Sequence, residues 1–121
     1  MKLRALRGAT TVEANVAAAI LEATTELVQE VMARNALDPE NMVSCIFTCT
    51  DDLDAEFPAV AARGLGFGQV PLLCAREIPV PGALPKVIRV LIHYYAPEAH
   101  TARHVYLGAA KALRADLESA Q

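Results

Sequence analysis

The sequence predicts an α+β fold in which a mixed β-sheet carries helices on one of its faces. One long segment with helical periodicity, residues 12–34, follows a short N-terminal strand. Three later runs are rich in β-branched and apolar residues: 43–50, 69–78 and 86–95. Only a short helix and tight turns separate these runs, and this order is typical of helices packed against one face of a sheet.

The N-terminal strand carries an arginine whose position needs an explanation. Strand alternation puts the side chains of Leu3, Ala5 and Arg7 on one face. Lys2, Arg4 and Leu6 share the other face. We expect the first face to be the apolar one, which would direct the permanent cation of Arg7 toward the core.

Capping signals predict the ends of the helices. Thr10 and Glu13 have the spacing of a capping box and predict the start of the long helix. Asn35 predicts its end, and Asp38 followed by Pro39 predicts a brief turn or helix. The apolar stripe that identifies the buried face comprises Val16, Ala17, Ile20, Leu21, Thr24, Leu27, Val28 and Val31.

The second half of the chain predicts a short helix and a central strand. Pro58 suits the first turn of a helix over about 57–64, which ends in glycine. The run 86–95 is apolar on both faces apart from Arg89, as in a strand with neighbours on both sides. In the tail, 104–107 suits a strand and 108–120 suits a helix.

Composition predicts one domain, residues 1–121, that shares a subunit interface. A chain of 121 residues has the length of a single domain. It is 54% hydrophobic but only 5% aromatic, and its mean hydropathy is +0.28. This apolar content is high for a small monomer, and an interface between copies would bury the surplus.

Charge and cysteine usage argue against several classes of partner. The net charge of −3 and the lack of long lysine or arginine runs give no nucleic-acid surface. No run approaches the ~18 apolar residues of a membrane span. The charged start lacks the apolar run of a signal peptide, so we expect a cytoplasmic protein. Three cysteines without a CxxC pair support neither a disulfide framework nor a zinc site.

Other motifs give no catalytic or cofactor site. His93, His100 and His104 lack the spacing of a metal site and are interpreted as ordinary histidines. The glycines of 64–68 follow a helix and do not connect a strand to a helix, which argues against a nucleotide loop. No serine or cysteine has the context of an activated nucleophile. We therefore expect no cofactor and no metal.

Arg89 is the residue with the strongest claim to a function. It lies between Ile88 and Val90 in the most apolar strand, so its face is expected to be covered. A buried guanidinium without an anionic partner costs several kcal/mol. A hairpin between 70–77 and 86–93 would bring Glu77 close to it. Two interpretations remain open at this point: an internal ion pair, or a ligand site.

These residues suggest a pocket for a small dicarboxylate. In this hypothesis Arg7 and Arg89 converge with Glu77, Cys74 and Tyr106, with Arg63 as a further candidate. Each has a plain structural interpretation: Cys74 and Tyr106 as core residues, and Arg63 as a cation opposing a helix dipole.

Five blocks of the sequence, in order, resemble the monofunctional chorismate mutases of the Bacillus type. They are RGATT at 7–11, DLDAEFPAVAAR at 52–63, VPLLCARE at 70–77, KVIRV at 86–90 and RHVYLGAAKALRADL at 103–117. The resemblance implies a ferredoxin-like chain in a homotrimer whose sheets form a pseudo-α/β barrel, with active sites at subunit interfaces. It implies the rearrangement of chorismate to prephenate without cofactor, metal or covalent intermediate.

The same resemblance implies a role for each candidate residue. Arg89 would stabilise charge on the breaking ether oxygen, and Arg7 and Tyr106 would bind the side-chain carboxylate. Glu77 and the region of Cys74 would contact the ring hydroxyl. The cleft would be completed by Phe57 and Arg63 of the neighbouring subunit and by the wall positions Leu73 and Leu113.

Two departures from the family pattern and three other interpretations accompany this reading. Val60 stands where the family often has lysine, which implies weaker substrate attraction. Ala115 replaces a proline, and a tail mobile from about 110 is expected. A related trimer that hydrolyses enamines or imines and a regulatory trimer that only binds an aromatic-pathway acid are alternatives. The third is a purely structural ion pair with no ligand.

Overall fold

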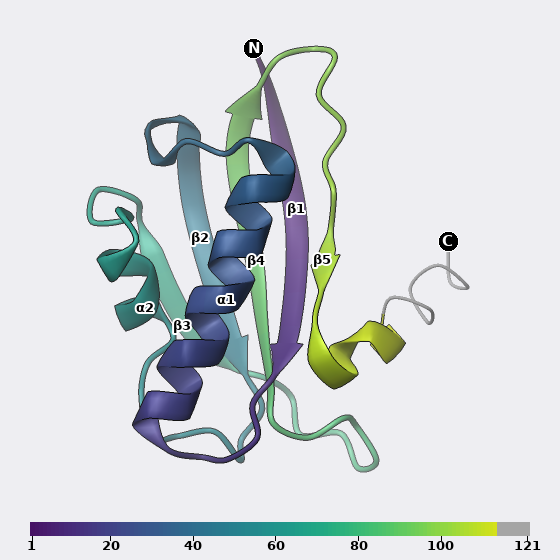
Figure 1. Ribbon diagram of the computed structural model, residues 1–121. Helices are drawn as coiled ribbons and strands as arrows, with labels where there is room; N and C mark the ends of the chain where they lie inside the picture. Colours follow the sequence, from purple (N-terminus) through teal and green to yellow (C-terminus); the bar gives the residue numbers. More distant parts are fainter. Residues whose placement is uncertain (114–121) are drawn as a thin grey trace.

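The computed structural model describes residues 1–113, which form a five-stranded sheet with helices on one face (Figure 1). The strands are β1 (Lys2–Thr11), β2 (Met42–Cys49), β3 (Leu72–Arg76), β4 (Val87–Ala96) and β5 (Val105–Tyr106). The helices are α1 (Ala17–Asn35) and α2 (Ala59–Gly64), with 3-10 turns η1 (Pro39–Asn41) and η2 (Gly108–Ala110). None of the helices in these residues is long and apolar enough to cross a membrane.

The strand order is β3-β2-β4-β1-β5, with β4 in the centre. β4 runs antiparallel to both β1 and β2, whereas β2–β3 and β1–β5 are parallel pairs. The predicted mixed sheet and its central strand are therefore confirmed. The predicted hairpin between β3 and β4 is wrong, because β2 lies between these two strands. The loop between β3 and β4 is short enough for a hairpin, but β2 pairs with both strands and separates them.

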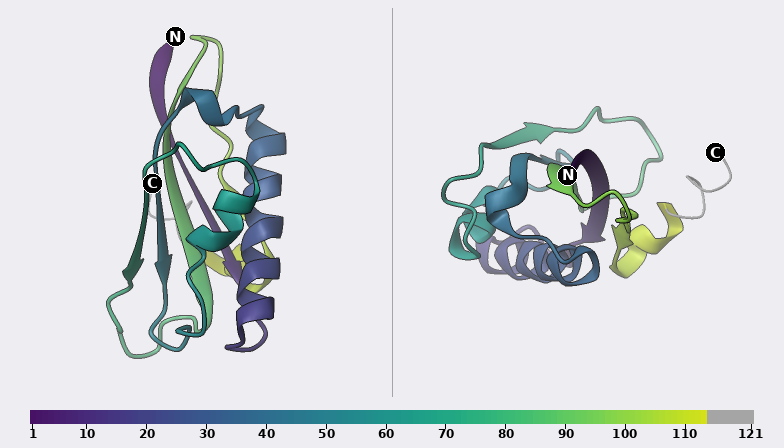
Figure 2. Two further views of the ribbon diagram at one scale, coloured as in Figure 1. Left: turned by 90° about the vertical axis from the view of Figure 1, so that its left-hand side faces the viewer. Right: turned by 90° about the horizontal axis from the view of Figure 1, so that it is seen from above.

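The main core lies between the sheet and the helices. Leu6 of β1, Phe47 of β2, and Ile92 and Tyr94 of β4 have no exposed surface and belong to one cluster. α1 contributes its stripe to this cluster, with Ile20, Thr24, Leu27, Val28, Val31 and Asn35 buried. Figure 2 shows α1 and α2 together on one side of the sheet.

Neither α1 nor α2 covers the opposite sheet face, which is called here the open face. It carries the side chains that alternate with the core positions, Leu3 and Arg7 among them. Leu3 is 51% exposed and its strand partner Tyr95 is 46% exposed. The expectation that Arg7 shares the core face is wrong, because Leu6 and not Leu3 meets α1. Arg7 lies on the open face.

The predicted start of α1 is also wrong, whereas its end is confirmed. Thr10 belongs to β1, and the amide of Val12 still bonds to the carbonyl of Lys86 as the strand leaves the sheet. The helix begins at Ala17 without a side-chain cap. It ends at Asn35, followed by Ala36 in the left-handed conformation with φ 49°.

The remaining elements lie close to their predicted ranges. Asp38 caps η1 by accepting the amide of Glu40, as its position before Pro39 indicates. α2 begins two residues after 57, and β3 is shorter than the predicted run 69–78. In the tail, β5 is followed by η2 and by a helical turn at 111–113. Most of the tail that we expect to be mobile, Ala115 included, lies outside the described residues.

Gly8 lies where two strands and a helix approach the backbone of β1 closely. A Cβ added there would lie 3.1 Å from Cγ1 of Val90, 3.2 Å from Cδ1 of Leu27 and 3.3 Å from the Val105 carbonyl oxygen. We expect Gly8→Ala to lower the free energy of unfolding by about 1–3 kcal/mol, as overpacking does. Gly68→Ala is the control, since its Cβ would meet nothing within 4 Å. Equal urea midpoints for the two variants would contradict this account.

Candidate active site

A pocket on the open face brings two predicted cations together. It has a volume of about 270 Å³ and is lined by Arg7, Gly8, Ala9, Ile46, Thr48, Arg89, Val90, Leu91 and Tyr106. Strand register explains the grouping, because Ala9 of β1 and Thr48 of β2 are both paired with Arg89 of the central strand. With Tyr106 of β5, four strands thus supply side chains to one concave surface.

Glu77 contacts Arg89, although not by the predicted route. Its Oε2 atom accepts a hydrogen bond of 2.9 Å from Nε of Arg89. The same oxygen accepts a bond of 2.7 Å from the hydroxyl of Thr48. Glu77 follows directly after β3, where its amide bonds to the carbonyl of Cys49. Its carboxylate therefore reaches Arg89 across β2, with Thr48 of that strand fixing it.

The ion pair leaves polar atoms available on both partners. Among residues 1–113, no hydrogen bond engages the two terminal nitrogens of Arg89 or the second carboxylate oxygen, Oε1, of Glu77. The Arg89 side chain is 41% exposed and that of Glu77 is 16% exposed. In the single chain the predicted cover over Arg89 is therefore incomplete: the side chain lies at the surface of the open face, and its ion pair is only partly desolvated.

Tyr106 and Leu113 border the same region. Tyr106 is buried in a small second cluster with Ala9, Val87 and Ala110, and Leu113 packs against this cluster. The wall position Leu73 is 59% exposed and is paired in register with Ile46, which lines the pocket. The open face therefore gathers Arg7, Arg89, Glu77 and Tyr106, with the two leucines on either side.

Three other predicted residues do not join this group within one chain. Cys74 is paired with Phe47, a core residue, and its side chain packs on the helix side of the sheet. Arg63 is exposed on α2, which packs against α1 and β3. Phe57 is 66% exposed just before α2. The predicted convergence of Cys74 and Arg63 on Arg89 is wrong for a single chain, because they belong to the opposite layer.

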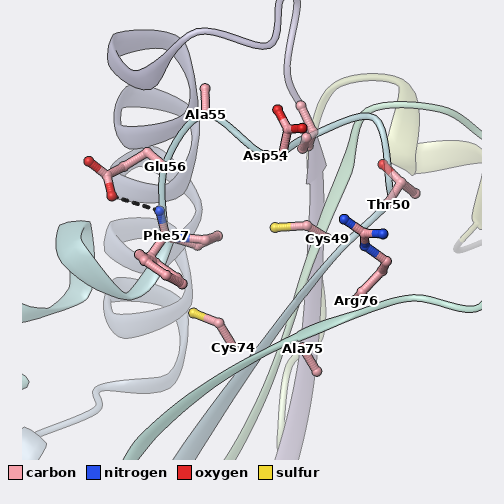
Figure 3. A pocket seen from close by; sticks show the side chains of 11 residues that line it. Cys49, Thr50, Asp54, Ala55, Glu56, Phe57, Cys74, Ala75 and Arg76 are labelled. Carbon is pink, nitrogen blue, oxygen red and sulfur yellow. Dashed lines mark hydrogen bonds between the residues drawn. The ribbon is translucent and has the colours of Figure 1, made fainter.

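Cys74 and Phe57 instead line a second pocket, of about 340 Å³, shown in Figure 3. Its charged side chains are Asp54, Glu56 and Arg76, so carboxylates outnumber cations there. The open-face pocket has two arginines in its lining and one carboxylate beside it. A small dianion is therefore attracted to the open-face pocket, although the second pocket is larger.

The thiols of the second pocket do not form an activated pair. Figure 3 shows the sulfur atoms of Cys49 and Cys74 directed into the pocket. Burial and the neighbouring groups raise the pKa of Cys49 to about 11, which suppresses the nucleophilic thiolate. Within residues 1–113, no three His, Cys, Asp or Glu side chains are grouped closely enough to hold a metal ion.

Two residues of the site were not singled out from the sequence as contributors. Thr48 belongs to an alternating strand, but its contact with Glu77 depends on a strand order that the sequence did not predict. His104 was interpreted as an ordinary histidine, yet its Nδ1 accepts the backbone amide of Arg7 at 3.0 Å. Knowledge that β2 pairs with β4 would have pointed to Thr48. The sequence around His104 gives no sign of its contact with Arg7.

The fold and the site together define a class: an α+β protein with a pocket on an open sheet face that two arginines line. The family described as chorismate mutase type I matches residues 3–117. The chain is 50% identical over 121 residues to the chorismate mutase AroH of Thermus thermophilus, covering 98% of this chain and 99% of that protein. It is 41% identical over 120 residues to AroH of Bacillus subtilis strain 168, with coverage of 97% and 94%.

A solved structure gives the same result for the fold. The chorismate mutase from Clostridium thermocellum aligns with a TM-score of 0.86 and 45% sequence identity, over 90% of this chain and 98% of that chain. The chain belongs to the type I chorismate mutase family. The family resemblance stated from the five sequence blocks is confirmed.

The raised pKa of Cys49 predicts slow alkylation in the folded protein. A thiol with a pKa of about 11 is ionised at pH 8 about two orders of magnitude less than an ordinary one. We expect iodoacetamide to modify Cys49 slower by that factor, with a rate that rises as pH approaches 11. Peptide mass spectrometry measures the modification, and the urea-unfolded chain is the control. Equal rates in the folded and unfolded protein would contradict the prediction.

Proposed function

We propose that this protein is a chorismate mutase, an isomerase that rearranges chorismate to prephenate in the biosynthesis of phenylalanine and tyrosine. Membership of the type I family supports this function directly. The observation in the site that carries it is Arg89, held through Nε by Glu77 so that its terminal nitrogens remain available. Family membership does not favour the enamine or imine hydrolase, nor the non-catalytic binding trimer.

The proposed reaction is a concerted [3,3] (Claisen) rearrangement. The ether C–O bond breaks while a C–C bond forms, and no atom enters or leaves the substrate. The protein therefore has two tasks: to hold the flexible side chain over the ring, and to stabilise charge that develops on the ether oxygen. Neither task needs a nucleophile, a metal or a cofactor.

Arg89 is suited to the second task. Its bond to Glu77 uses Nε and leaves two terminal N–H groups that can donate to the ether oxygen. Because Thr48 also bonds to the same carboxylate oxygen, the guanidinium is oriented before substrate binds. A donor oriented in advance acts without reorganisation when the transition state forms.

The remaining groups are suited to holding the substrate. Arg7 and Tyr106 face the same pocket as Arg89, and we assign them to the side-chain carboxylate. Oε1 of Glu77 is available to accept the ring hydroxyl, together with the backbone near Cys74. Leu73 and Leu113 are assigned to the apolar walls.

We further propose a homotrimer with active sites at subunit interfaces. The open face exposes the paired residues Leu3 and Tyr95 at one end and Leu73 beside the pocket, apolar side chains that a second copy would bury. Phe57 and Arg63 are exposed on the other layer of the chain, where they are available to a neighbour's pocket. We also propose a cytoplasmic location, which the free thiols Cys45, Cys49 and Cys74 support.

Replacement of Arg89 by alanine tests the catalytic assignment. We expect kcat for conversion of chorismate to fall by about 10²–10³ or more, as for loss of an oriented donor. The assay follows the loss of the ultraviolet absorbance of chorismate and identifies prephenate as product. Arg34→Ala is the matched control, because it removes an arginine from the exposed pair with Glu30 and leaves the pocket intact.

The two interpretations of the Arg89 ion pair give different outcomes in this experiment. If the pair is only structural, Arg89→Ala leaves Glu77 partly buried without its partner and lowers the melting temperature. In the mutase interpretation the folded variant loses activity. A folded, fully active Arg89→Ala protein would contradict the proposed role, and an inactive wild type would contradict the proposed function.

A charge on the open face tests the trimer. We expect Leu3→Glu to convert the trimer to a monomer by light scattering, because it would bury a carboxylate in the interface. Activity should fall with it by at least about tenfold, since Phe57 and Arg63 no longer complete the pocket. Val16→Glu is the control, because Val16 is 53% exposed at the start of α1. A trimeric Leu3→Glu protein would contradict the proposed interface.

A further inference from the structure

We propose that His104 is a positioning residue for substrate binding: its unprotonated Nδ1 fixes the backbone at Arg7 and aligns Arg7 with Tyr106. The inference rests on the proposed function for the role of these two residues, but the contact itself is independent of it. His104 does not itself line the pocket, but it contacts the backbone of Arg7, which does. It acts through the strand that carries Arg7.

The contact extends a very short strand pair by one residue. β5 consists of Val105 and Tyr106 alone, paired with Gly8 and Ala9 of β1. The ladder continues beyond Tyr106 through the amide of Leu107, which donates to the carbonyl of Ala9. At the other end, the amide of Arg7 donates to Nδ1 of His104 at 3.0 Å. A side chain thus takes the place of a strand carbonyl at the residue that binds the carboxylate.

The backbone beneath the His104 ring is fixed from the opposite side. Asn35, at the end of α1, donates from Nδ2 to the carbonyl of Arg103 at 2.9 Å and accepts its amide at 2.8 Å. A third bond, to the carbonyl of Val31, fixes the amide group of Asn35, which is buried. Arg103 is therefore held by α1. Because His104 follows it directly, the ring is held in place where it accepts the Arg7 amide.

The same geometry makes the contact dependent on protonation. Only an unprotonated Nδ1 can accept the Arg7 amide, so the neutral ring carries its proton on Nε2. Partial burial lowers the pKa of His104 from its ordinary value, and the nearby charge of Arg7 lowers it further, whereas a hydrogen bond with the Arg7 backbone raises it by less. The other adjacent cation is its chain neighbour Arg103, and in the described part of the chain no carboxylate contributes to the shift.

The sign of the pH effect follows from this lowered pKa. The neutral ring is favoured in the folded state, so the contact is complete at neutral pH. It is lost as pH falls through the folded-state pKa of His104, below its ordinary value near 6.5. Protonation then places an N–H group opposite the Arg7 amide. The substrate carboxylate remains ionised in this pH range, so a change in substrate binding is caused by a titrating group of the protein.

Asparagine and leucine provide a matched pair of substitutions at position 104. Their side chains have the same number of heavy atoms and a similar shape, but only asparagine places an acceptor near the position of Nδ1. We expect His104→Leu to raise KM for chorismate by about 3- to 10-fold, with a smaller change in kcat, as for loss of one hydrogen bond. His104→Asn should keep the KM of the wild type at neutral pH.

Two further readouts separate positioning from a purely structural role. The KM of the wild type should rise as pH falls below about 6.5, and that of His104→Asn should not. Hydrogen exchange of the Arg7 amide, measured by NMR, should be slow in the wild type and His104→Asn and about tenfold faster in His104→Leu. Should His104→Leu fail to fold, His104→Gln, whose acceptor is displaced by one bond, takes its place.

The exchange measurement does not require turnover, so the two proposals can fail separately. A wild type without mutase activity, but with an Arg7 amide that loses protection in His104→Leu, would overturn the proposed function and leave the contact established. An active His104→Leu enzyme with the KM and amide protection of the wild type would overturn the positioning role. The same holds if His104→Asn behaves like His104→Leu.

Discussion

The alternation of side chains along β4 is the constraint on which the rest of the structure depends. Ile88, Val90, Ile92 and Tyr94 face the helices and are almost fully buried. Burial of these four side chains fixes the register of the central strand, since a shift of one residue would send them all to the other face. Arg89 must then project from the open face, between strands that supply Thr48 and Arg7. The pocket is thus a consequence of how the core is packed.

The charge balance of the open face depends on one carboxylate oxygen. Oε2 of Glu77 accepts from both Thr48 and Arg89, which orients the guanidinium. Arg7 has no carboxylate partner among residues 1–113, so the pocket keeps an excess of positive charge. An isolated cation at a partly exposed site costs little while water solvates it, but a neighbouring chain would remove that water. An anionic ligand would then provide the missing partner.

Most helices and strands could be predicted from the sequence, but the order of the strands in the sheet could not, for a physical reason. Periodicity reports burial within a segment, and it identified the long helix and the central strand. Strand order is set by contacts between distant segments, which is why the predicted hairpin missed the insertion of β2 between β3 and β4. The Glu77–Arg89 pair was predicted correctly from an incorrect neighbour. The pocket hypothesis grouped Cys74 with the arginines, whereas its plain interpretation as a core residue agrees with its packing on the helix side of the sheet.

The bonds that Asn35 makes to Arg103 constrain the length of α1, because Asn35 is the last residue of this helix. The position of Asn35 in the last turn decides whether its buried side-chain amide reaches the backbone of Arg103, 68 residues away in the sequence. Because each residue turns an α-helix by about 100°, insertion or deletion of one residue would direct the amide elsewhere. The number of residues in α1 is therefore constrained by the segment that leads into the edge strand β5.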